Sequence, residues 1–285
     1  EALRNAVCVG VDLDLIAGLD NFCWPDPVES MKTPDGRYKL AQLVRANRAL
    51  DDVCRAYQLP CISGKDSMKN DATINGTKIS VPPTLLFSLI GNHKDVRNAI
   101  SSDFKTVGDI IYLVGETHQE LGASELAFML YDETNGKSGI GGQVPQIDAT
   151  RNLALYRSLT NSMSNGLVAS AHDCSDAGLA AALTECCFGC DSGAVLEISN
   201  LFNNNKDLDI WGALFGESLG RILVSVKPQD SQLFEESMMN HECNKIGKVT
   251  SNDMIIFNNR DQIILSANVK ELREAWKGTL NGGNN

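Results

Sequence analysis

The sequence predicts a mixed α+β and α/β chain of two domains, the first rich in sheet and the second α/β. Its 285 residues exceed the size of a typical domain, which is roughly 100–200 residues. Strand-like and helix-like apolar patterns alternate along most of the chain, as expected for packed layers of helix and sheet. A polar stretch at residues 101–107 separates two such series. We therefore expect domains at residues 1–104 and 105–280, followed by a tail at 281–285.

Composition limits the classes of partner. The net charge of −11 argues against nucleic acid, because phosphate backbones are bound by clustered Lys and Arg. No stretch approaches the ~20 apolar residues of a membrane span and no signal peptide opens the sequence, so we expect a cytoplasmic protein that does not enter membranes. The nine cysteines are scattered and odd in number, which favours reduced thiols. Cys187 and Cys190 form a lone C-x-x-C pair, which is a weak signal for zinc or redox chemistry.

The first domain opens with residues 1–7, which form helix readily and have no cap before them. We therefore expect the chain to begin within a helix. Residues 16–24 predict a strand, and three prolines then mark an irregular loop. Apolar residues recur at helical spacing from 40 to 57, which predicts a helix of about five turns with one face against a core. Asn-Gly at 75–76 predicts a hairpin turn, and an apolar strand follows at 85–90.

The second domain continues the alternation of strands and helices. Strands are expected at 108–115, 167–173, 194–198, 221–226, near 246, 254–257 and 262–266. Helices are expected at 148–159, 177–188, 230–240 and 269–276. Asp148 or Thr150 should cap the first of these helices, and Asp176 the second. The glycine-rich residues 136–142 predict a mobile loop by composition alone.

The first candidate site follows an apolar run and has the composition Ser-Gly-Lys-Asp-Ser. Glycine lets the backbone approach a ligand closely, the hydroxyls can donate hydrogen bonds, and lysine supplies a positive charge. We therefore expect an anion-binding turn, with these phosphate-binding residues: Ser63, Gly64, Lys65 and Ser67. It is not a Walker loop, which needs an earlier glycine and a Ser or Thr after the lysine. An exposed polar turn without a ligand is the alternative.

Hard oxygen donors occur at two other places. Glu1 and Asn5 are four residues apart and share a face of the expected helix, where both oxygens could reach Mg²⁺. A solvated helix face is the ordinary alternative. Asp173 ends an apolar strand just before a helix, where a cation and phosphate oxygens can meet, although it could also be a simple turn residue. The neighbouring His172 is given no catalytic role.

Weaker nucleotide-binding candidates occur at two strand ends. Asp20 and Asn21 lie toward the end of the strand expected at 16–24. A glycine turn before the strand at 221–226 gathers three more: Glu217, Ser218 and Arg221. Charged residues beside glycine turns are common, so these residues carry little weight alone.

Six segments, taken in order, give the chain a family resemblance. They are Glu1-Ala-Leu-Arg-Asn5, Leu19-Asp-Asn-Phe-Cys-Trp24, Ile62-Ser-Gly-Lys-Asp-Ser-Met68, Ser170-Ala-His-Asp-Cys-Ser-Asp-Ala-Gly178, Leu214-Phe-Gly-Glu-Ser218 and Glu271-Leu-Arg-Glu-Ala-Trp-Lys-Gly-Thr-Leu280. Each is weak alone, but the ordered set spans nearly the whole chain. With it, the chain resembles the C-terminal half of the phosphoribosylformylglycinamidine synthase family, ligases of purine biosynthesis.

The resemblance implies a fold. The synthetase part of that family looks like two fused copies of the PurM-like, or aminoimidazole ribonucleotide (AIR) synthetase-like, fold. Each copy has a sheet-rich A domain and an α/β B domain, and the copies are related by pseudo-twofold symmetry. This chain is similar to the second copy without the beginning of its A domain.

The resemblance also implies a reaction and partners. Formylglycinamide ribonucleotide, ATP and glutamine-derived ammonia would give the amidine, ADP and phosphate through an iminophosphate. The catalytic histidine and the working ATP site are associated with the first copy, so the catalytic residues are expected outside this chain. The implied partners are that first copy and a glutaminase domain or subunit, and a homodimer stays open.

Some site residues can be carried over one by one. Glu1, Asn5 and Asp173 match positions that hold Mg²⁺ on an auxiliary nucleotide, ATP or ADP, although an upstream ligand would be missing. Residues 63–67 match the segment expected to hold the phosphate of the ribonucleotide. Ala177 departs from the glycine usual in the family, which should tighten the turn.

The leading hypothesis is therefore a fragment of an ATP-dependent ligase with little activity of its own. One alternative is a self-contained ATP-using enzyme of the same superfamily, such as AIR synthetase or selenophosphate synthetase. The incomplete A domain and the lack of a catalytic motif argue against it. The other alternative is a non-catalytic module that completes the fold and holds a structural nucleotide.

Overall fold

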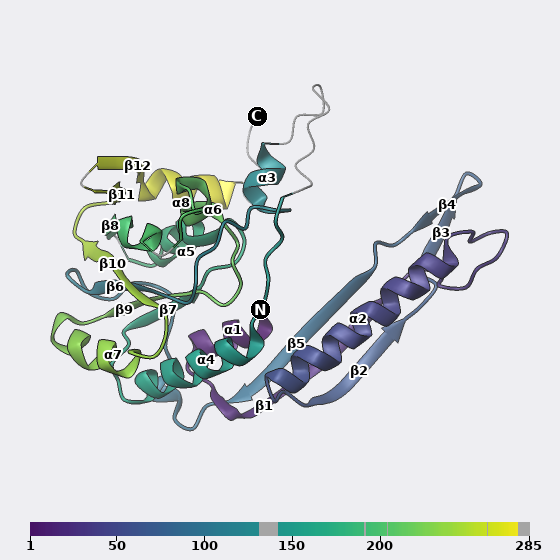
Figure 1. Ribbon diagram of the computed structural model, residues 1–285, viewed down its shortest axis with the longest axis horizontal. Helices are drawn as coiled ribbons and strands as arrows, with labels where there is room; N and C mark the ends of the chain where they lie inside the picture. Colours follow the sequence, from purple (N-terminus) through teal and green to yellow (C-terminus); the bar gives the residue numbers. More distant parts are fainter. Residues whose placement is uncertain (131–141, 191, 204, 261, 279–285) are drawn as a thin grey trace.

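The computed structural model describes residues 1–130, 142–190, 192–203, 205–260 and 262–278. Most of the glycine-rich loop expected at 136–142, and the tail expected at 281–285, lie outside these residues. Figure 1 shows a long arm, residues 12–92, projecting from a layered body made of residues 2–8 and the described residues between 93 and 278. The first helix lies in the body although it precedes the arm in sequence. The domain limits expected from the sequence stay a prediction.

The arm is a three-stranded sheet with one long helix. Strand β1 (Asp12–Cys23) lies in the centre, parallel to β2 (Cys61–Ser67) and antiparallel to β5 (Thr84–Asn92). Helix α2 (Gly36–Ala56) runs along one face, as the helical spacing predicted. At the tip, β3 (Asp71–Ile74) and β4 (Thr77–Ser80) form the predicted hairpin. Asn75 and Gly76 have φ values of 50° and 79°, the positive angles that such a turn requires.

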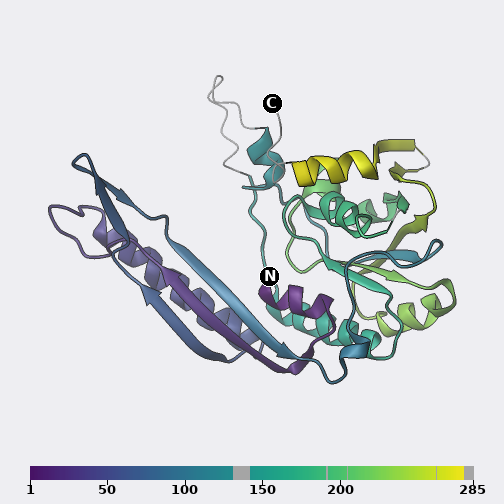
Figure 2. The same ribbon diagram turned by 180° about the vertical axis from the view of Figure 1, so that it is seen from behind.

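The second face of the arm sheet is not covered by any described part of the chain, and Figure 2 shows its strands in front of α2. Burial along β5 alternates, as it does in a strand with one packed face. Phe87 and Leu89 are half-buried on the α2 side, whereas Leu86 and Ile90 are each 60% exposed. The prediction that α2 packs against a core is therefore only partly met, since the core beneath it is a single sheet.

The body is built on a seven-stranded sheet in the order β12-β11-β8-β10-β6-β9-β7. Its strands are β6 (Ile110–Val114), β7 (Ser170–Asp173), β8 (Gly193–Glu197), β9 (Ile222–Val226), β10 (Cys243–Thr250), β11 (Met254–Asn259) and β12 (Gln262–Asn268). Neighbours are antiparallel except β8 and β11, which are parallel. Each strand lies where the sequence predicted one.

Helices cover both faces of this sheet and enclose two hydrophobic cores. One core lies under α1 (Ala2–Cys8), α4 (Ala149–Ser164) and α7 (Ser231–Ser237), and includes Val7 and Leu159. The other lies under α5 (Gly178–Cys186), α6 (Ile210–Phe215) and α8 (Val269–Gly278), and includes Leu183. All three side chains are 0% exposed, and burying each fully contributes about 1.5–3 kcal/mol. The short helices α3 (Glu125–Met129) and α6 were not predicted from the sequence.

Two expectations about the whole chain can be compared with these elements. None of the helices in the described residues has the length and apolar character needed to cross a membrane. All nine cysteines fall within the described residues, and all are free thiols.

Candidate functional site

Asp173 lies at the end of β7, against the first helix. The side chain of Arg4 on α1 is 4% exposed and its Nε lies 3.6 Å from Asp173 Oδ2. Arg4 Nη2 also donates to Ser175 Oγ at 2.8 Å, and Ser175 Oγ donates to Asp173 Oδ2. Reasoning from the sequence placed α1 beside Asp173 but chose Glu1 and Asn5 as the contacting residues. The contact is made by Arg4, whose only signal in the sequence is its place between them.

His172 extends this cluster toward α5. Its Nδ1 lies 3.3 Å from Asp173 Oδ1, and its Nε2 lies 2.6 Å from Glu185 Oε2. Burial lowers the pKa of His172, but hydrogen bonds to Asp173 and Glu185 outweigh burial and raise it to about 9. Burial also acts to raise the pKa of Asp173, yet hydrogen bonds from His172 and Ser175 and the charge of Arg4 hold it well below its usual range. At neutral pH the cationic Arg4 therefore pairs with Asp173, and the protonated His172 lies between the side chains of Asp173 and Glu185.

The raised pKa of His172 predicts a pH-dependent stability. A histidine whose folded pKa is about 9 instead of 6.5 contributes stability that is complete below about pH 6.5 and is lost as the pH rises through about 9. We expect the free energy of unfolding to fall by at most about 3 kcal/mol over this interval. Urea unfolding from pH 6 to 10 measures this fall in the wild type and in His172→Gln. The difference between the two pH profiles is the contribution of His172. Identical pH profiles would contradict the prediction.

The fit of Mg²⁺ can be judged from the same contacts. Oxygen donors are the right kind for this ion, but Arg4 and His172 already supply positive charge on both sides of the Asp173 carboxylate. Glu1 and Asn5 are exposed on α1. Within the described residues, no group of three or more His, Cys, Asp or Glu side chains is arranged to hold a metal. Asp173 is thus already paired with two cationic side chains, and the predicted roles of Glu1, Asn5 and Asp173 as magnesium ligands stay untested.

The start of α5 differs from the prediction that Asp176 caps it. The N-cap is Ala177, whose φ of 56° is unusual for a residue with a side chain, and no side chain caps the helix. Instead, Glu217 Oε1 accepts hydrogen bonds from the backbone N–H groups of Ala177 and Glu125, each at 2.9 Å. The prediction was wrong because the acceptor comes from a turn 40 residues further along the chain. A positive φ is also the physical reason why glycine would suit position 177.

The turn before β9 is hydrogen-bonded to neighbouring segments through the side chains of Glu217, Ser218 and Arg221. Ser218 Oγ accepts from the N–H of His118 at 3.0 Å. Arg221 is 0% exposed, and it donates to the backbone oxygens of Ser218 and Gly216 and to Thr117 Oγ1. These contacts join the turn before β9 to residues 117–125 and to α5. The nucleotide-binding role predicted for the three residues stays untested, and the buried contacts of Arg221 support a structural role.

The predicted anion-binding turn is a strand. Residues 61–67 pair with β1 along their length, with Asn21 opposite Lys65 and Asp20 opposite Gly64. Pairing with β1 therefore overrides the turn-like composition. A Cβ at Gly64 would come within 2.6 Å of Asp20 Oδ1, so glycine here makes room for that carboxylate.

Alternation along the strands divides the predicted residues between the two faces of the arm sheet. Asp20 and Gly64 share the face covered by α2. Asn21 and Lys65 lie on the uncovered face, and Lys65 Nζ donates to Ser67 Oγ. Alternation places Ser63 on that face too. The structure thus brings Ser63, Lys65 and Ser67 together, but on the arm, whereas Asp173 belongs to the body (Figure 1).

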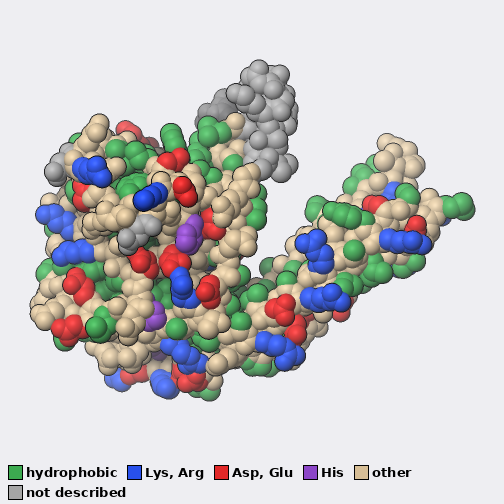
Figure 3. Space-filling model, in the orientation of Figure 1, with side chains coloured by type: hydrophobic (Ala, Val, Ile, Leu, Met, Phe, Trp, Pro, Cys, Tyr) green, Lys and Arg blue, Asp and Glu red, His purple; other side chains and the backbone are tan. Residues whose placement is uncertain are grey.

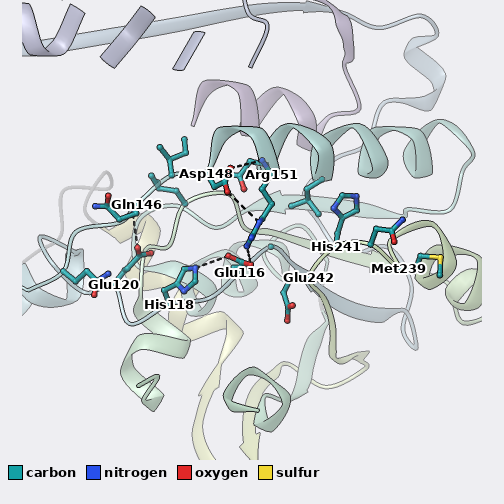
Figure 4. Close-up of a pocket in the computed structure, with 16 residues that line it drawn as sticks. Glu116, His118, Glu120, Gln146, Asp148, Arg151, Met239, His241 and Glu242 are labelled. Atoms are coloured by element: carbon teal, nitrogen blue, oxygen red, sulfur yellow. Dashed lines mark hydrogen bonds and ion pairs between the residues drawn. The ribbon is translucent and has the colours of Figure 1, made fainter. Parts of the chain in front are cut away.

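A pocket that the sequence did not reveal opens where β6 ends and α4 begins (Figure 4). It has a volume of about 670 Å³. The Arg151 guanidinium forms an ion pair with Glu116, and Glu116 Oε2 lies 3.3 Å from His118 Nε2. Asp148 caps α4 as predicted, accepting from the N–H of Arg151 at 3.0 Å. Glu116 and His118 follow the end of β6, and Asp148 and Arg151 lie at the start of α4. These positions at element ends are the only sequence signal for the pocket.

Charge limits what this pocket can bind. Its described lining includes the acidic residues Glu116, Glu120, Asp148 and Glu242, and one arginine, Arg151. Glu120 is 1% exposed; its Oε1 accepts from the N–H of Gln146 at 2.9 Å, and its Oε2 has no partner in the described part of the chain. The excess of carboxylates disfavours an unaccompanied phosphate group.

Comparison with known proteins identifies the body. The family described as "AIR synthase related protein, C-terminal domain" matches residues 106–257, more than half of the chain. The chain belongs to the AIR synthase related family. The matched segment contains β6 to β10 and most of β11, together with Asp173, Glu217 and the pocket beside α4.

The similarity to solved structures covers the arm as well as the body. The chain is similar to PurL of Thermotoga maritima complexed with FGAR, with a TM-score of 0.68 and 16% identity over 94% of this chain and 41% of that one. It is also similar to the hydrogenase maturation protein HypE complexed with ATP (TM-score 0.61, 13% identity, 93% and 78% of the two chains). A HypE–HypF complex matches with a TM-score of 0.62 and 14% identity, covering 94% and 80%. At these identities the likeness shows the fold alone, and the chain spans about two-fifths of the PurL chains.

Proposed function

We propose that the chain is the second AIR synthetase-like half of a phosphoribosylformylglycinamidine synthase. In the complete enzyme, formylglycinamide ribonucleotide would be phosphorylated by ATP on its amide oxygen, and ammonia would displace that phosphate. The observation that carries the proposal is the uncovered face of the arm sheet. It combines a lysine between two serines with exposed apolar side chains, so it offers both a phosphate-binding row and a surface for a second protein part.

The apolar part of this face needs a partner. Leu86 and Ile90 are each 60% exposed and project from the same face as Asn21 and Lys65. A second sheet of the same kind, packed face to face, would bury both apolar side chains and enclose the polar row. The first half of a pseudo-twofold synthetase would supply such a sheet. PurL complexed with FGAR is a chain more than twice as long, of which 41% matches this fold, so it has room for a second half.

In this arrangement Lys65 would neutralise the phosphate of the ribonucleotide, while the Ser63 and Ser67 hydroxyls would donate hydrogen bonds to it. Lys65 is exposed and its Nζ is held by Ser67 Oγ alone among the described contacts, so it is free to turn toward a ligand. ATP would supply the phosphoryl group from a site in the other half. No catalytic residue is assigned within this chain.

Lys65→Ala, made in the complete enzyme, is expected to raise the Michaelis constant for formylglycinamide ribonucleotide. Loss of a charge-assisted hydrogen bond costs about 1.5–3 kcal/mol, which corresponds to a factor of about 10–150. Initial-rate kinetics with ammonia as nitrogen donor measure this Michaelis constant. Lys94→Ala is the matched control, because Lys94 is an exposed lysine at the base of the arm that pairs with Asp12 at 2.9 Å. An unchanged constant in the Lys65 variant would refute the phosphate role.

The match to HypE favours one second candidate. This chain covers 78% of the HypE chain complexed with ATP, so a self-contained ATP-using enzyme of the family is the competing function. The two proposals differ in what the chain does alone. With formylglycinamide ribonucleotide, ATP and ammonia, we expect no release of ADP until the other half is added. ADP release by the chain alone would favour the self-contained enzyme, and bound nucleotide without turnover in the presence of both halves would favour a non-catalytic module.

A further inference from the structure

Two thiols meet on the arm, outside the contacts described above. Cys54 lies on the last turn of α2 and Cys61 is the first residue of β2, and their Sγ atoms are 3.8 Å apart. Cys61 is exposed and Cys54 is half-buried. The C-x-x-C pair is less suited to oxidation, because Cys187 is buried and Cys190 Sγ faces the backbone oxygens of Cys186 and Cys187.

We propose that Cys54 and Cys61 are a reversible dithiol–disulfide pair that is oxidised by small disulfides and fixes the end of α2 to the start of β2. A disulfide bond is about 2.05 Å long, so the two sulfur atoms must approach by less than 2 Å. The connecting residues form a short turn in which Gln58 has a φ of 56°. Small shifts at the end of α2 are enough for this approach, because helix ends are where local opening is easiest.

The surroundings give a small disulfide access to both sulfur atoms. Cys54 and Cys61 line one open hollow of about 680 Å³. Its charged residues are Asp20, Asp51 and Arg55, and Arg55 Nε pairs with Asp51 at 2.8 Å. One carboxylate is therefore in excess, which favours a neutral disulfide over an anionic one such as oxidised glutathione.

The order of reaction follows from exposure. The Cys61 thiolate attacks the small disulfide, forming a mixed disulfide at Cys61 and releasing one small thiolate. Cys54 then loses its proton to solvent and attacks the Cys61 sulfur, which closes the intramolecular disulfide and releases the second thiolate. Burial and the neighbouring Cys61 thiol raise the pKa of Cys54 to about 12, so Cys54 is the slower nucleophile. Two protein thiols are oxidised and one small disulfide is reduced to two thiols.

Thiol counting with the neutral reagent 2-hydroxyethyl disulfide tests the pair. After oxidation and denaturation, the nine thiols of the wild type are expected to fall by two and to recover with dithiothreitol. Cys54→Ser should stop at a mixed disulfide on Cys61, which mass spectrometry of the peptides identifies. Cys61→Ser should form neither product at these positions. Cys190→Ser, the matched control, should still lose two thiols.

A second measurement detects the predicted effect on the arm. Hydrogen exchange of the amides at residues 55–67 is expected to slow by about tenfold or more on oxidation, because the cross-link removes open states of the turn. The Cys54→Ser variant should show no such change. Loss of two thiols from Cys61→Ser, or oxidation of the wild type without a peptide linking Cys54 to Cys61, would overturn the pair. Unchanged exchange in the cross-linked protein would overturn its effect on β2.

Discussion

Asp173→Asn is expected to lower the free energy of unfolding of the body by about 3–5 kcal/mol at pH 7. The substitution keeps the shape of the side chain but removes the negative charge that pairs with Arg4, whose side chain is 4% exposed. Leaving a buried cation without its partner typically costs about this much. His172 would also lose one of its two hydrogen-bonded carboxylates. Urea unfolding followed by circular dichroism measures the change, and hydrogen exchange should show that α1 and β7 open first.

Asp14→Asn is the matched control for this prediction. Asp14 accepts a hydrogen bond from Arg157 at 2.8 Å, but the two side chains are 73% and 41% exposed. Solvent screens such a pair, so its loss should change stability by less than about 1 kcal/mol. A further check is Arg4→Met combined with Asp173→Asn, which removes both charges and should recover part of the loss. If Asp173→Asn is no more destabilising than Asp14→Asn, the buried cluster does not hold α1 to β7.

Much of the fold could be predicted because its patterns are local. The spacing of apolar residues located α2, and Asn75-Gly76 fixed the hairpin at the tip of the arm, since both depend on residues close together in sequence. The order of the seven strands could not be obtained in this way. It depends on which strands meet after long connections, as when β8 pairs with both β10 and β11. The uncovered face of the arm was also hidden, because the alternation in β5 does not say what covers each side.

In the candidate site, too, local signals could be read from the sequence but contacts between distant residues could not. The sequence singled out Asp173 and the Ser63–Ser67 segment from their residue types, which are local signals. It could not tell that Arg4 would occupy the place beside Asp173 and Ser175, because Arg4 and Ser175 are 171 positions apart. It also paired Asp20 with Asn21, although strand geometry sends neighbouring side chains to opposite faces. Residue type thus predicted candidates, while their neighbours had to come from the structure.

The second large effect is expected for Arg221→Met, which should lower the free energy of unfolding by about 3 kcal/mol or more. Arg221 is 0% exposed, and burial lowers its pKa, so the buried guanidinium depends on its hydrogen bonds and on the nearby Glu120 and Glu217 carboxylates. Methionine has a comparable length but no donors, so the backbone oxygens of Gly216 and Ser218 would lose their guanidinium partner. Each hydrogen bond from a charged group contributes about 1.5–3 kcal/mol. Urea unfolding measures the total.

Arg97→Met is the control, because Arg97 is 86% exposed and pairs, among the described residues, only with Asp95, which is half-buried. It should leave the free energy of unfolding nearly unchanged, because solvent screens an exposed ion pair. If Arg221 holds the turn before β9 in place, the Arg221 variant should lose protection first in the segments that this turn contacts. The turn at 216–218 supplies the Glu217 carboxylate to Ala177, so the N-terminus of α5 should exchange hydrogen faster and the buried Cys174 should become reactive toward iodoacetamide. Lost stability without these local changes would mean that Arg221 acts through the core as a whole, and unchanged stability would mean that the guanidinium is not needed to hold the turn.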